Sequence, residues 1–290
     1  MTVSCVDIKW VQVEATTKCN AWCPACSRNV NGYGIHPNLT IQDLSLTRLE
    51  EVLSLFPNLE VVHFCGTYGD AIAAQDIVSM IGIAKQHCKK IQLNTNGSLR
   101  NIDWWHEFAV LLANIDHDIW FCLDGLNDTH HIYRQGTNFQ TIIDNAKAFI
   151  NAGGVASWQF IPWAHNEHQI ADCIKMSQQL GFKNFRFIKN ARYNDSAKHY
   201  RTGEPLHIVN WSKNQTYNKF AKKQEFVDPK NCLHLTQPSV YLNANGTISA
   251  CCWMNLQDTF DTIDQLPDIK TELSTMPRPI CISSCGFSHV

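Results

Sequence analysis

The sequence has little net charge, no long apolar run and no recognisable export signal. Lysine and arginine together number 24 and aspartate and glutamate 26, so the formal charge at pH 7 is -2. This balance excludes a strongly basic protein that binds nucleic acid with its whole surface. Apolar stretches such as 77–84 are too short to cross a bilayer, and Asp7 and Lys9 stand where a signal peptide needs its apolar segment. We therefore expect a cytoplasmic protein without a membrane or nucleic-acid partner.

Apolar residues are abundant in the composition and charged residues are few. Hydrophobic residues make up 44% of the chain and charged residues 17%, which provides for a sizeable core and argues against intrinsic disorder. At roughly 150 residues per domain, the 290 residues suggest one large domain or two smaller units.

Two sequence patterns alternate along the first two thirds of the chain. Runs rich in β-branched and aromatic residues predict strands, and stretches with apolar residues at helical spacing predict helices between them. The expected strands are 8–16, 59–66, 90–95, 118–125, 156–163 and 185–188, and the expected helices are 41–56, 74–88, 102–114, 138–152 and 167–180. This alternation predicts an α/β fold with a parallel sheet, either doubly wound or a complete or partial barrel. In each of these folds, function collects at the carboxyl ends of the strands.

Cysteine is unusually abundant, with 13 residues. The reducing cytosol disfavours disulfides, and an odd number fits a disulfide framework poorly. Metal binding or catalysis is therefore the better explanation for some of them.

The first cysteine group is Cys19, Cys23 and Cys26, in a loop that closely follows the first expected strand. Three thiolates in a CxxxCxxC spacing can bind three irons of a [4Fe–4S] cube, which leaves the fourth iron open to a small molecule. Structural zinc and coincidence are the alternatives. Zinc would need a fourth ligand close by, and the nearest histidine, His36, lies ten residues further on. The spacing favours an iron–sulfur cluster.

This group and the segments around it resemble the radical S-adenosylmethionine enzymes. The resemblance implies a partial (β/α)6 TIM-like barrel, in which the open iron chelates the amino and carboxylate groups of S-adenosylmethionine. It implies that one electron from the cluster, supplied by an external donor such as flavodoxin or ferredoxin, cleaves this cofactor to methionine and a 5′-deoxyadenosyl radical. The radical then takes a hydrogen atom from the substrate.

Three later turns resemble the family's cofactor-binding segments in order. The glycine-rich turn after the second strand has Asp70 where many members have glutamate, and alone it could be an ordinary strand-to-helix turn. A TNG-like turn (94–97) follows the third strand, and the fourth strand ends in a motif similar to Ser-Ile-Asp-Gly. The implied S-adenosylmethionine contacts are Gly66, Thr67, Gly69, Asp70, Thr95, Asn96, Cys122, Asp124 and Arg134.

Two positions depart from the family pattern. Ala25 precedes the third cysteine, at a position where the family usually has an aromatic residue, and we count it among the expected cofactor contacts. Cys122 replaces the serine that the family has in the fourth strand. Neither difference removes a cluster ligand, but both positions concern the contacts with the adenine and ribose of S-adenosylmethionine. Cys65 and Cys122 end their strands near the expected active site. Either thiol could give a hydrogen atom to a substrate radical, or both could be small buried apolar residues.

The second cysteine group lies around a hairpin expected from strand-like runs at 239–243 and 247–250. It resembles the twitch domain, the shortened relative of the SPASM extension, which binds one auxiliary [4Fe–4S] cluster. A zinc ribbon with four cysteine ligands is the alternative. The spacing after the glycine of the hairpin favours Cys251 over its neighbour Cys252. The implied ligands are Cys232, Cys251, Cys281 and Cys285.

These features divide the chain into a partial barrel (1–205), a linker (206–225) and a twitch-like module (226–290). The segment 183–230 carries eleven lysines or arginines against four acids. It is either a docking surface for an anionic substrate or a solvated helical face beside the linker, and we favour the second interpretation.

The resemblance predicts a radical S-adenosylmethionine oxidoreductase that oxidises, dehydrogenates or rearranges a small molecule. An enzyme that crosslinks, oxidises or epimerises a peptide is the main alternative, although we recognise no peptide-binding domain ahead of the barrel. A non-enzymatic zinc- or RNA-binding module is the remote one.

Overall fold

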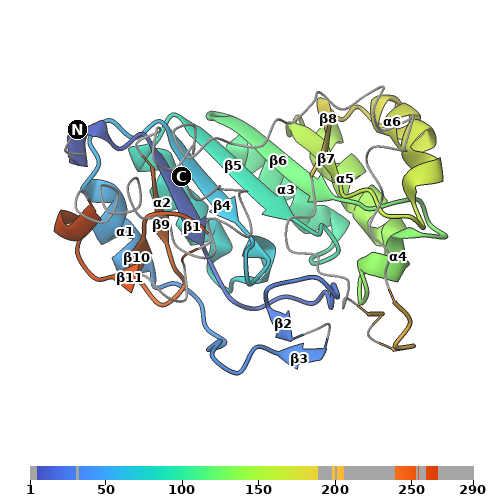
Figure 1. Ribbon diagram of the computed structural model, residues 1–290. Coiled ribbons are helices and arrows are strands. Elements are labelled where there is room, and N and C mark those ends of the chain that lie inside the picture. Colours follow the sequence, from blue (N-terminus) through green and yellow to red (C-terminus); the bar gives the residue numbers. More distant parts are fainter. Residues whose placement is uncertain are drawn as a thin grey trace, which may run out of the picture.

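A single sheet dominates the computed structural model, which describes residues 5–30, 33–188, 198–199, 201–205, 239–252, 254 and 259–266. The described strands of this sheet have the order β11-β10-β9-β1-β4-β5-β6-β7-β8 (Figure 1). Every neighbouring pair from β1 to β8 is parallel, as is β1 with β9. The α/β fold with a partial TIM-like barrel is confirmed.

The barrel part consists of strands that alternate with helices, as predicted. Its strands are β1 (Trp10–Glu14), β4 (Val61–Cys65), β5 (Lys90–Thr95), β6 (Asp116–Cys122), β7 (Ala156–Phe160) and β8 (Asn184–Phe187). Its main helices are α1 (Leu46–Ser54), α2 (Ile77–His87), α3 (Ile102–Leu112), α5 (Phe139–Asn151) and α6 (Ile170–Gln179). The short elements are η1 (Cys5–Asp7), β2 (Asn29–Val30), β3 (Tyr33–Ile35), η2 (Ala71–Ala73), α4 (His130–Tyr133) and η3 (Glu167–Gln169). The six strands and five main helices agree with the sequence prediction except at their ends.

Polar caps set the start of three helices. The side-chain oxygens of Ser45, Asn101 and Asn138 accept hydrogen bonds from the N–H three residues further on, at 3.1, 3.0 and 2.9 Å. Each cap satisfies an N–H that has no partner inside its helix, so α1 begins at Leu46 rather than at residue 41. None of the described helices is long and apolar enough to cross a membrane.

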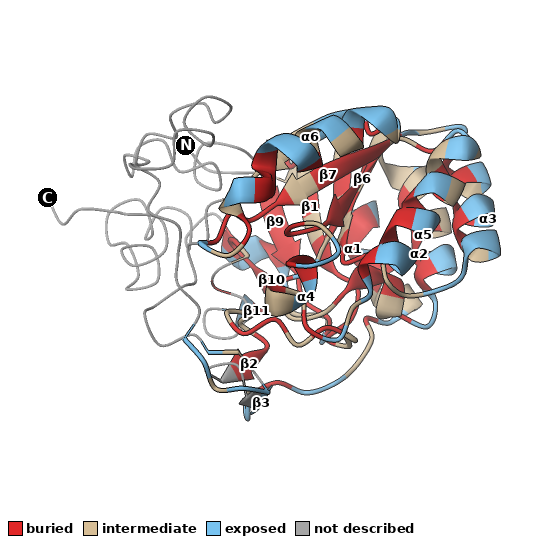
Figure 2. Cartoon of the chain, turned by 90° about the vertical axis from the view of Figure 1, so that its right-hand side faces the viewer, coloured by how far each residue is buried: buried red, intermediate tan, exposed pale blue. Residues whose placement is uncertain are grey.

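The apolar core lies between the sheet and the helices (Figure 2). Val62 and Phe64 of β4 and Ile91 and Leu93 of β5 are fully buried there. Successive strand residues point to opposite faces, so the residues between them belong to the other face of the sheet. We call this other face, which carries His63, the inner face.

The predicted hairpin is present and extends the sheet beyond β1. It comprises β9 (Ser239–Leu242) and the antiparallel β10 (Ile248–Ser249), and β11 (Thr259–Phe260) and η5 (Ile263–Gln265) follow it. Gly246 has a φ of +85° in its turn, a conformation that favours glycine. The linker 206–225 lies outside the described residues, so the three domain boundaries remain predictions.

Candidate active site

The three-cysteine loop follows β1 and is anchored on both sides. Cys23 is buried, and Cys19 and Cys26 are partly buried. Inside the loop, the backbone N–H of Cys26 donates to the carbonyl of Cys23 at 3.0 Å, and Asn29 Nδ2 donates to that carbonyl at 3.0 Å. The N–H of Trp22 donates to the carbonyl of Gln135 at 2.8 Å, which ties the loop to the segment after α4. Hydrogen bonds within the protein therefore hold the loop in a defined shape.

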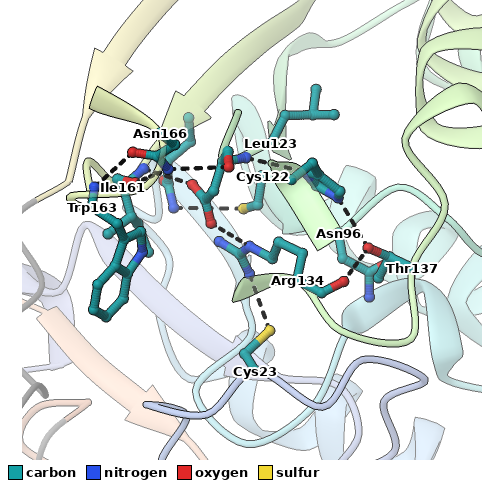
Figure 3. Close-up of polar contacts among 12 residues, drawn as sticks. Cys23, Asn96, Cys122, Leu123, Arg134, Thr137, Ile161, Trp163 and Asn166 are labelled. Carbon is teal, nitrogen blue, oxygen red and sulfur yellow. Dashed lines mark hydrogen bonds and ion pairs between the residues drawn. The ribbon is translucent and has the colours of Figure 1, made fainter. Parts of the chain in front are cut away.

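Polar groups that follow β5 and α4 are directed at the sulfurs of this loop. Asn96 Nδ2, after β5, lies 3.8 Å from Cys19 Sγ. Arg134 Nη1, after α4, lies 3.8 Å from Cys23 Sγ, and this contact is drawn in Figure 3. The N–H of Ala21 lies 3.4 Å from Cys19 Sγ. The structure thus brings two of the predicted cofactor residues to two of the predicted ligands.

The environment of the thiols fits an iron–sulfur cluster. Burial raises the pKa of Cys23 to about 12, although the nearby Arg134 lowers it. Burial, Asp70 and the neighbouring thiolates raise the pKa of Cys19 above its ordinary value. Since thiolates are the ligating form, a cation must replace these protons. Within the described residues no three His, Cys, Asp or Glu side chains converge on a single ion, and a cube needs no such convergence because each cysteine binds its own iron.

Asp124 and Arg134 form the buried ion pair of the site. Arg134 Nε lies 2.5 Å from Asp124 Oδ2, and Asp124 is 0% exposed. The other carboxylate oxygen accepts the N–H of Ile161 at 2.6 Å, and Asn166 Nδ2 donates to the Asp124 carbonyl at 3.1 Å (Figure 3). The carboxylate is thereby fixed by β7 and in turn holds the guanidinium toward the cysteine loop.

Asp70 joins the glycine-rich turn to the TNG-like turn. Its carboxylate accepts from Thr95 Oγ1 at 2.9 Å and from the N–H groups of Asn96 and Ile72 at 2.6 and 3.0 Å. The pKa of this carboxyl is raised by burial, against these donors. Its oxygens are therefore used inside the protein, and the side chain acts by positioning the two turns.

The glycine-rich turn lies against the start of the cysteine loop. A Cβ on Gly69 would lie 2.0 Å from the carbonyl oxygen of Thr16, and one on Gly66 would lie 2.5 Å from the carbonyl oxygen of Gly69. Both distances are far below contact, so neither position can take a side chain without moving backbone. The two glycines thus let this turn approach the segment that follows β1 closely.

Glu14 is a residue of the site that sequence reasoning missed. Its carboxylate accepts the N–H groups of Thr67, Tyr68 and Gly69 at 3.0, 3.0 and 2.8 Å, and it also accepts the hydroxyl of Tyr241 on β9. Burial raises the pKa of Glu14 to about 7 against these four donors. A single carboxylate therefore connects β1, the glycine-rich turn and the hairpin. The one sequence signal was an acid at the end of a strand that is otherwise buried.

The remaining predicted site residues are Cys122, Cys65 and Ala25. Cys122 Sγ lies 3.5 Å from Gln159 Nε2 on the inner face, and Cys65 Sγ lies 3.6 Å from the carbonyl oxygen of Val13. Burial raises the pKa of both thiols, so they stay protonated. Ala25 packs with the apolar side chains around the cysteine loop.

The auxiliary site is only partly described. Cys251 is buried after β10. Cys232, Cys281 and Cys285 lie outside the described residues, so the auxiliary ligand set remains a prediction.

Comparisons with known proteins show a distant relative and several similar structures. No protein-family model matches the chain. The 7,8-dihydro-6-hydroxymethylpterin dimethyltransferase of Methanocaldococcus jannaschii is 25% identical over 141 residues, which cover 47% of this chain. The match takes in 27% of the length of that protein.

Solved structures agree over almost the whole chain. Streptococcus suis SuiB bound to precursor peptide SuiA has a TM-score of 0.65 at 14% identity, over 97% of this chain and 70% of SuiB. AnSMEcpe with bound AdoMet and the Kp18Cys peptide has a TM-score of 0.62 at 14% identity, over 96% of this chain and 88% of that protein. At such identities the likeness establishes a shared fold.

Proposed function

We propose that this chain, which has the fold of the radical S-adenosylmethionine enzymes, cleaves S-adenosylmethionine reductively and removes a hydrogen atom from a substrate. The observation that carries the proposal is the three-cysteine loop at the carboxyl end of β1, with Asn96 and Arg134 directed at two of its sulfurs. Thiolates in this spacing suit an iron–sulfur cluster with one open iron.

The chain's own residues would bind, orient and shield this chemistry. Cys19, Cys23 and Cys26 would each hold one iron of a [4Fe–4S] cluster, which together with S-adenosylmethionine supplies the reducing electron and the carbon radical. Arg134 would offset thiolate charge at Cys23, as Asn96 would by hydrogen bonding at Cys19. Apolar side chains that pack around the loop, namely Ala21, Tyr133, Ile161 and Trp163, would exclude water and so limit side reactions of a radical.

S-adenosylmethionine would lie between the turns 66–70, 94–97 and 122–125. Because Asp70 and Glu14 are engaged within the protein, the glycine-rich turn would contact the cofactor through its backbone. Arg134, held in place by the buried Asp124, would supply the charged contact at the end of β6. Glu14 is then a positioning residue, since it acts through the backbone of 67–69.

The net reaction we favour is oxidation or rearrangement of a small molecule, because the inner face carries closely bonded polar side chains. The auxiliary cluster at Cys232, Cys251, Cys281 and Cys285 would accept an electron from the substrate radical, and a flavodoxin or ferredoxin would reduce the first cluster. Cys122, on the inner face beside Gln159, or Cys65, at the end of β4, would give a hydrogen atom to the substrate radical.

Peptide modification is the second candidate function. It is supported by the likeness to SuiB, whose structure holds a precursor peptide, and to anSMEcpe, whose structure holds the Kp18Cys peptide. A peptide would need to enter the same inner face.

The direct test is reductive cleavage of S-adenosylmethionine by the anaerobically reconstituted protein. With dithionite we expect 5′-deoxyadenosine and methionine in equal amounts, and none from a Cys19/Cys23/Cys26→Ala triple variant. A Cys5/Cys88/Cys173→Ala triple variant is the matched control and should cleave like the wild type, since these cysteines lie on other elements. Zinc in place of iron, without cleavage, would contradict the proposal and support a binding module.

A further inference from the structure

Four polar side chains form a hydrogen-bonded row across the inner face, which we call the inner-face network: His63, Asn94, Gln159 and Arg186. His63 Nε2 lies 2.6 Å from Asn94 Oδ1, and Asn94 Nδ2 donates to Gln159 Oε1 at 3.0 Å. Arg186 donates to the same oxygen from Nε at 3.1 Å and from Nη2 at 2.7 Å. The row crosses from β4 to β8, and of its four members only Asn94 also belongs to a turn described above.

The chemistry of arginine fixes every proton in this row. A guanidinium only donates, so the atom of Gln159 that faces Arg186 is its oxygen. The atom of Asn94 that faces this oxygen must then be its nitrogen, which leaves Asn94 Oδ1 to accept from His63 Nε2. Burial lowers the pKa of His63 to about 4, so the ring is neutral at pH 7. Nδ1 of His63 is therefore an acceptor, and in the described part of the chain it is buried without a partner.

Arg186 is a cation with no direct carboxylate partner among the described residues, although Asp118 interacts with it electrostatically at longer range. Its guanidinium forms no ion pair within 4.0 Å among the described residues. Burial lowers the pKa of Arg186, which reflects the cost of removing this charge from water. The Cζ atom lies 3.6 Å from the ring centroid of Trp120, so the guanidinium is held by an aromatic face and by Gln159. Within the described residues, the guanidinium is thus oriented without a directly bound counterion.

The network adjoins the candidate active site. Gln159 Nε2 lies 3.5 Å from Cys122 Sγ, and Cys122 is two residues before Asp124, the partner of Arg134. A ligand held by the network would thus be beside the carboxyl end of β6, where the radical chemistry is proposed.

We propose that Arg186 binds a carboxylate of the substrate, while His63 Nδ1 accepts a hydrogen bond from a hydroxyl or amino group of the same molecule. This deepens the proposed function and rests on it, since the inner face is where the substrate would lie. One oriented guanidinium matches the two oxygens and single charge of a carboxylate, whereas a phosphate dianion would be left with excess charge. The carboxylate can belong to a small acid or to a peptide, and the two sources differ in size.

The test uses fluorinated probes and the reconstituted protein with S-adenosylmethionine bound. N-trifluoroacetylserine and N-trifluoroacetyl-Ala-Ala-Ser, each as free acid and as amide, are titrated by ¹⁹F line broadening, together with trifluoroethyl phosphate. We expect the acids to bind about tenfold or more tightly than the amides, because a charge-assisted pair is lost in the amide. Tighter binding of the single residue indicates a small-molecule substrate, and tighter binding of the tripeptide indicates a peptide.

Variants assign the preference to Arg186. Arg186→Gln should abolish the difference between acid and amide, and Arg186→Lys should reduce it. The control is Arg100→Gln, because Arg100 also lies over an aromatic ring, that of Trp104 at 5.5 Å, but outside the site. If circular dichroism shows that Arg186→Gln does not fold, the difference in affinity between acid and amide is judged from Arg186→Lys.

A second comparison tests His63. N-trifluoroacetylalanine lacks the hydroxyl and should bind more weakly than N-trifluoroacetylserine, and a His63→Phe variant should bind the two alike. An equal affinity for both probes in the wild type would overturn this half of the proposal.

Cleavage of S-adenosylmethionine tests the proposed function separately from the carboxylate site. Without substrate, the wild type and the Arg100→Gln control should form 5′-deoxyadenosine. If the wild type forms none, the proposed function fails. If the wild type does cleave S-adenosylmethionine, either of two results would contradict the carboxylate site alone. The first is that Arg186→Gln, or a folded Arg186→Lys, keeps the full preference for acids over amides. The second is that trifluoroethyl phosphate binds best of all the probes.

Discussion

The two faces of the same strands differ sharply in chemistry. On the helix-covered face of β4 and β5, Val62, Phe64 and Leu93 are fully buried in the apolar core. On the inner face of these strands, His63 and Asn94 are hydrogen-bonded to each other and, through Gln159, to Arg186. One face supplies apolar burial and the other supplies oriented donors, acceptors and charge. The two-residue period of a strand lets adjacent residues serve stability and chemistry separately.

The first way to sharpen this contrast is Phe64→Ala on the helix-covered face. Loss of a fully buried ring should lower the free energy of unfolding by about 3–5 kcal/mol, since a cavity remains. Val78→Ala, at a position 47% exposed, should cost about 0.5 kcal/mol or less. Urea unfolding measures both. Equal losses would mean that the helix-covered face does not carry the stability.

Asp124→Asn breaks the buried charge pair at the end of the inner face. It leaves Arg134 buried without a carboxylate, which should cost about 3–5 kcal/mol in unfolding free energy. The control is Asp43→Asn, whose partner Lys18 has 43% of its side chain exposed, and about 0–1 kcal/mol is expected from the loss of that ion pair. Iron content should fall only in the Asp124 variant, because Arg134 loses its orientation toward Cys23. A normal iron content in that variant would contradict the role given to the pair.

The inner face should also make the fold sensitive to acid. The pKa of His63 is lowered to about 4 by burial, so between pH 6.5 and 4 the unfolded chain binds a proton that the folded chain does not. Stability should therefore fall as the pH falls through this range, by about 3 kcal/mol from His63 alone. His63→Gln should remove this component when unfolding is followed at several pH values. The pH-dependent contributions of His130 and His165, whose pKa values are also lowered by burial, should remain in this variant.

Glu14→Gln tests the carboxylate that connects β1, the glycine-rich turn and the hairpin. An amide offers one oxygen to four donors, so we expect a loss of about 1–3 kcal/mol and weaker binding of S-adenosylmethionine. Glu60→Gln removes an exposed partner of Lys9 and is the control, with about 0–1 kcal/mol expected. Equilibrium dialysis with S-adenosylmethionine checks the second effect, and an unchanged affinity would reduce Glu14 to a structural role.

The strands and helices of the barrel were predictable because their signals are local. Alternating runs such as 90–95 and caps such as Ser45 depend on neighbours in sequence. The pairing of β9 with β1 was not predictable in this way, because its partners are separated by more than 200 residues and no local pattern encodes the choice.

The site was predictable where it rests on spacing. The cysteine loop and the positions of Asn96 and Arg134 followed from motifs, and the structure brings them together. Glu14 and Arg186 were missed because each looks ordinary in sequence. Residues 185–188 were predicted as a strand, and β8 confirms this, but Arg186 was also counted in the basic segment 183–230, whose favoured interpretation was a solvated helical face. The place of Arg186 on the inner face, bonded to Gln159, was not predicted. Only the register of the sheet shows which face a strand residue occupies.

The most direct measurement is iron and sulfide per chain after anaerobic reconstitution, in the wild type, the Cys19/Cys23/Cys26→Ala variant and the Cys5/Cys88/Cys173→Ala control. The account predicts about eight irons in the wild type and the control and about four in the first variant, as two [4Fe–4S] clusters require. About four irons that fall to none would keep the radical enzyme and remove the auxiliary cluster. Iron that is absent from the wild type, or unchanged when the three loop cysteines are replaced, would contradict the account.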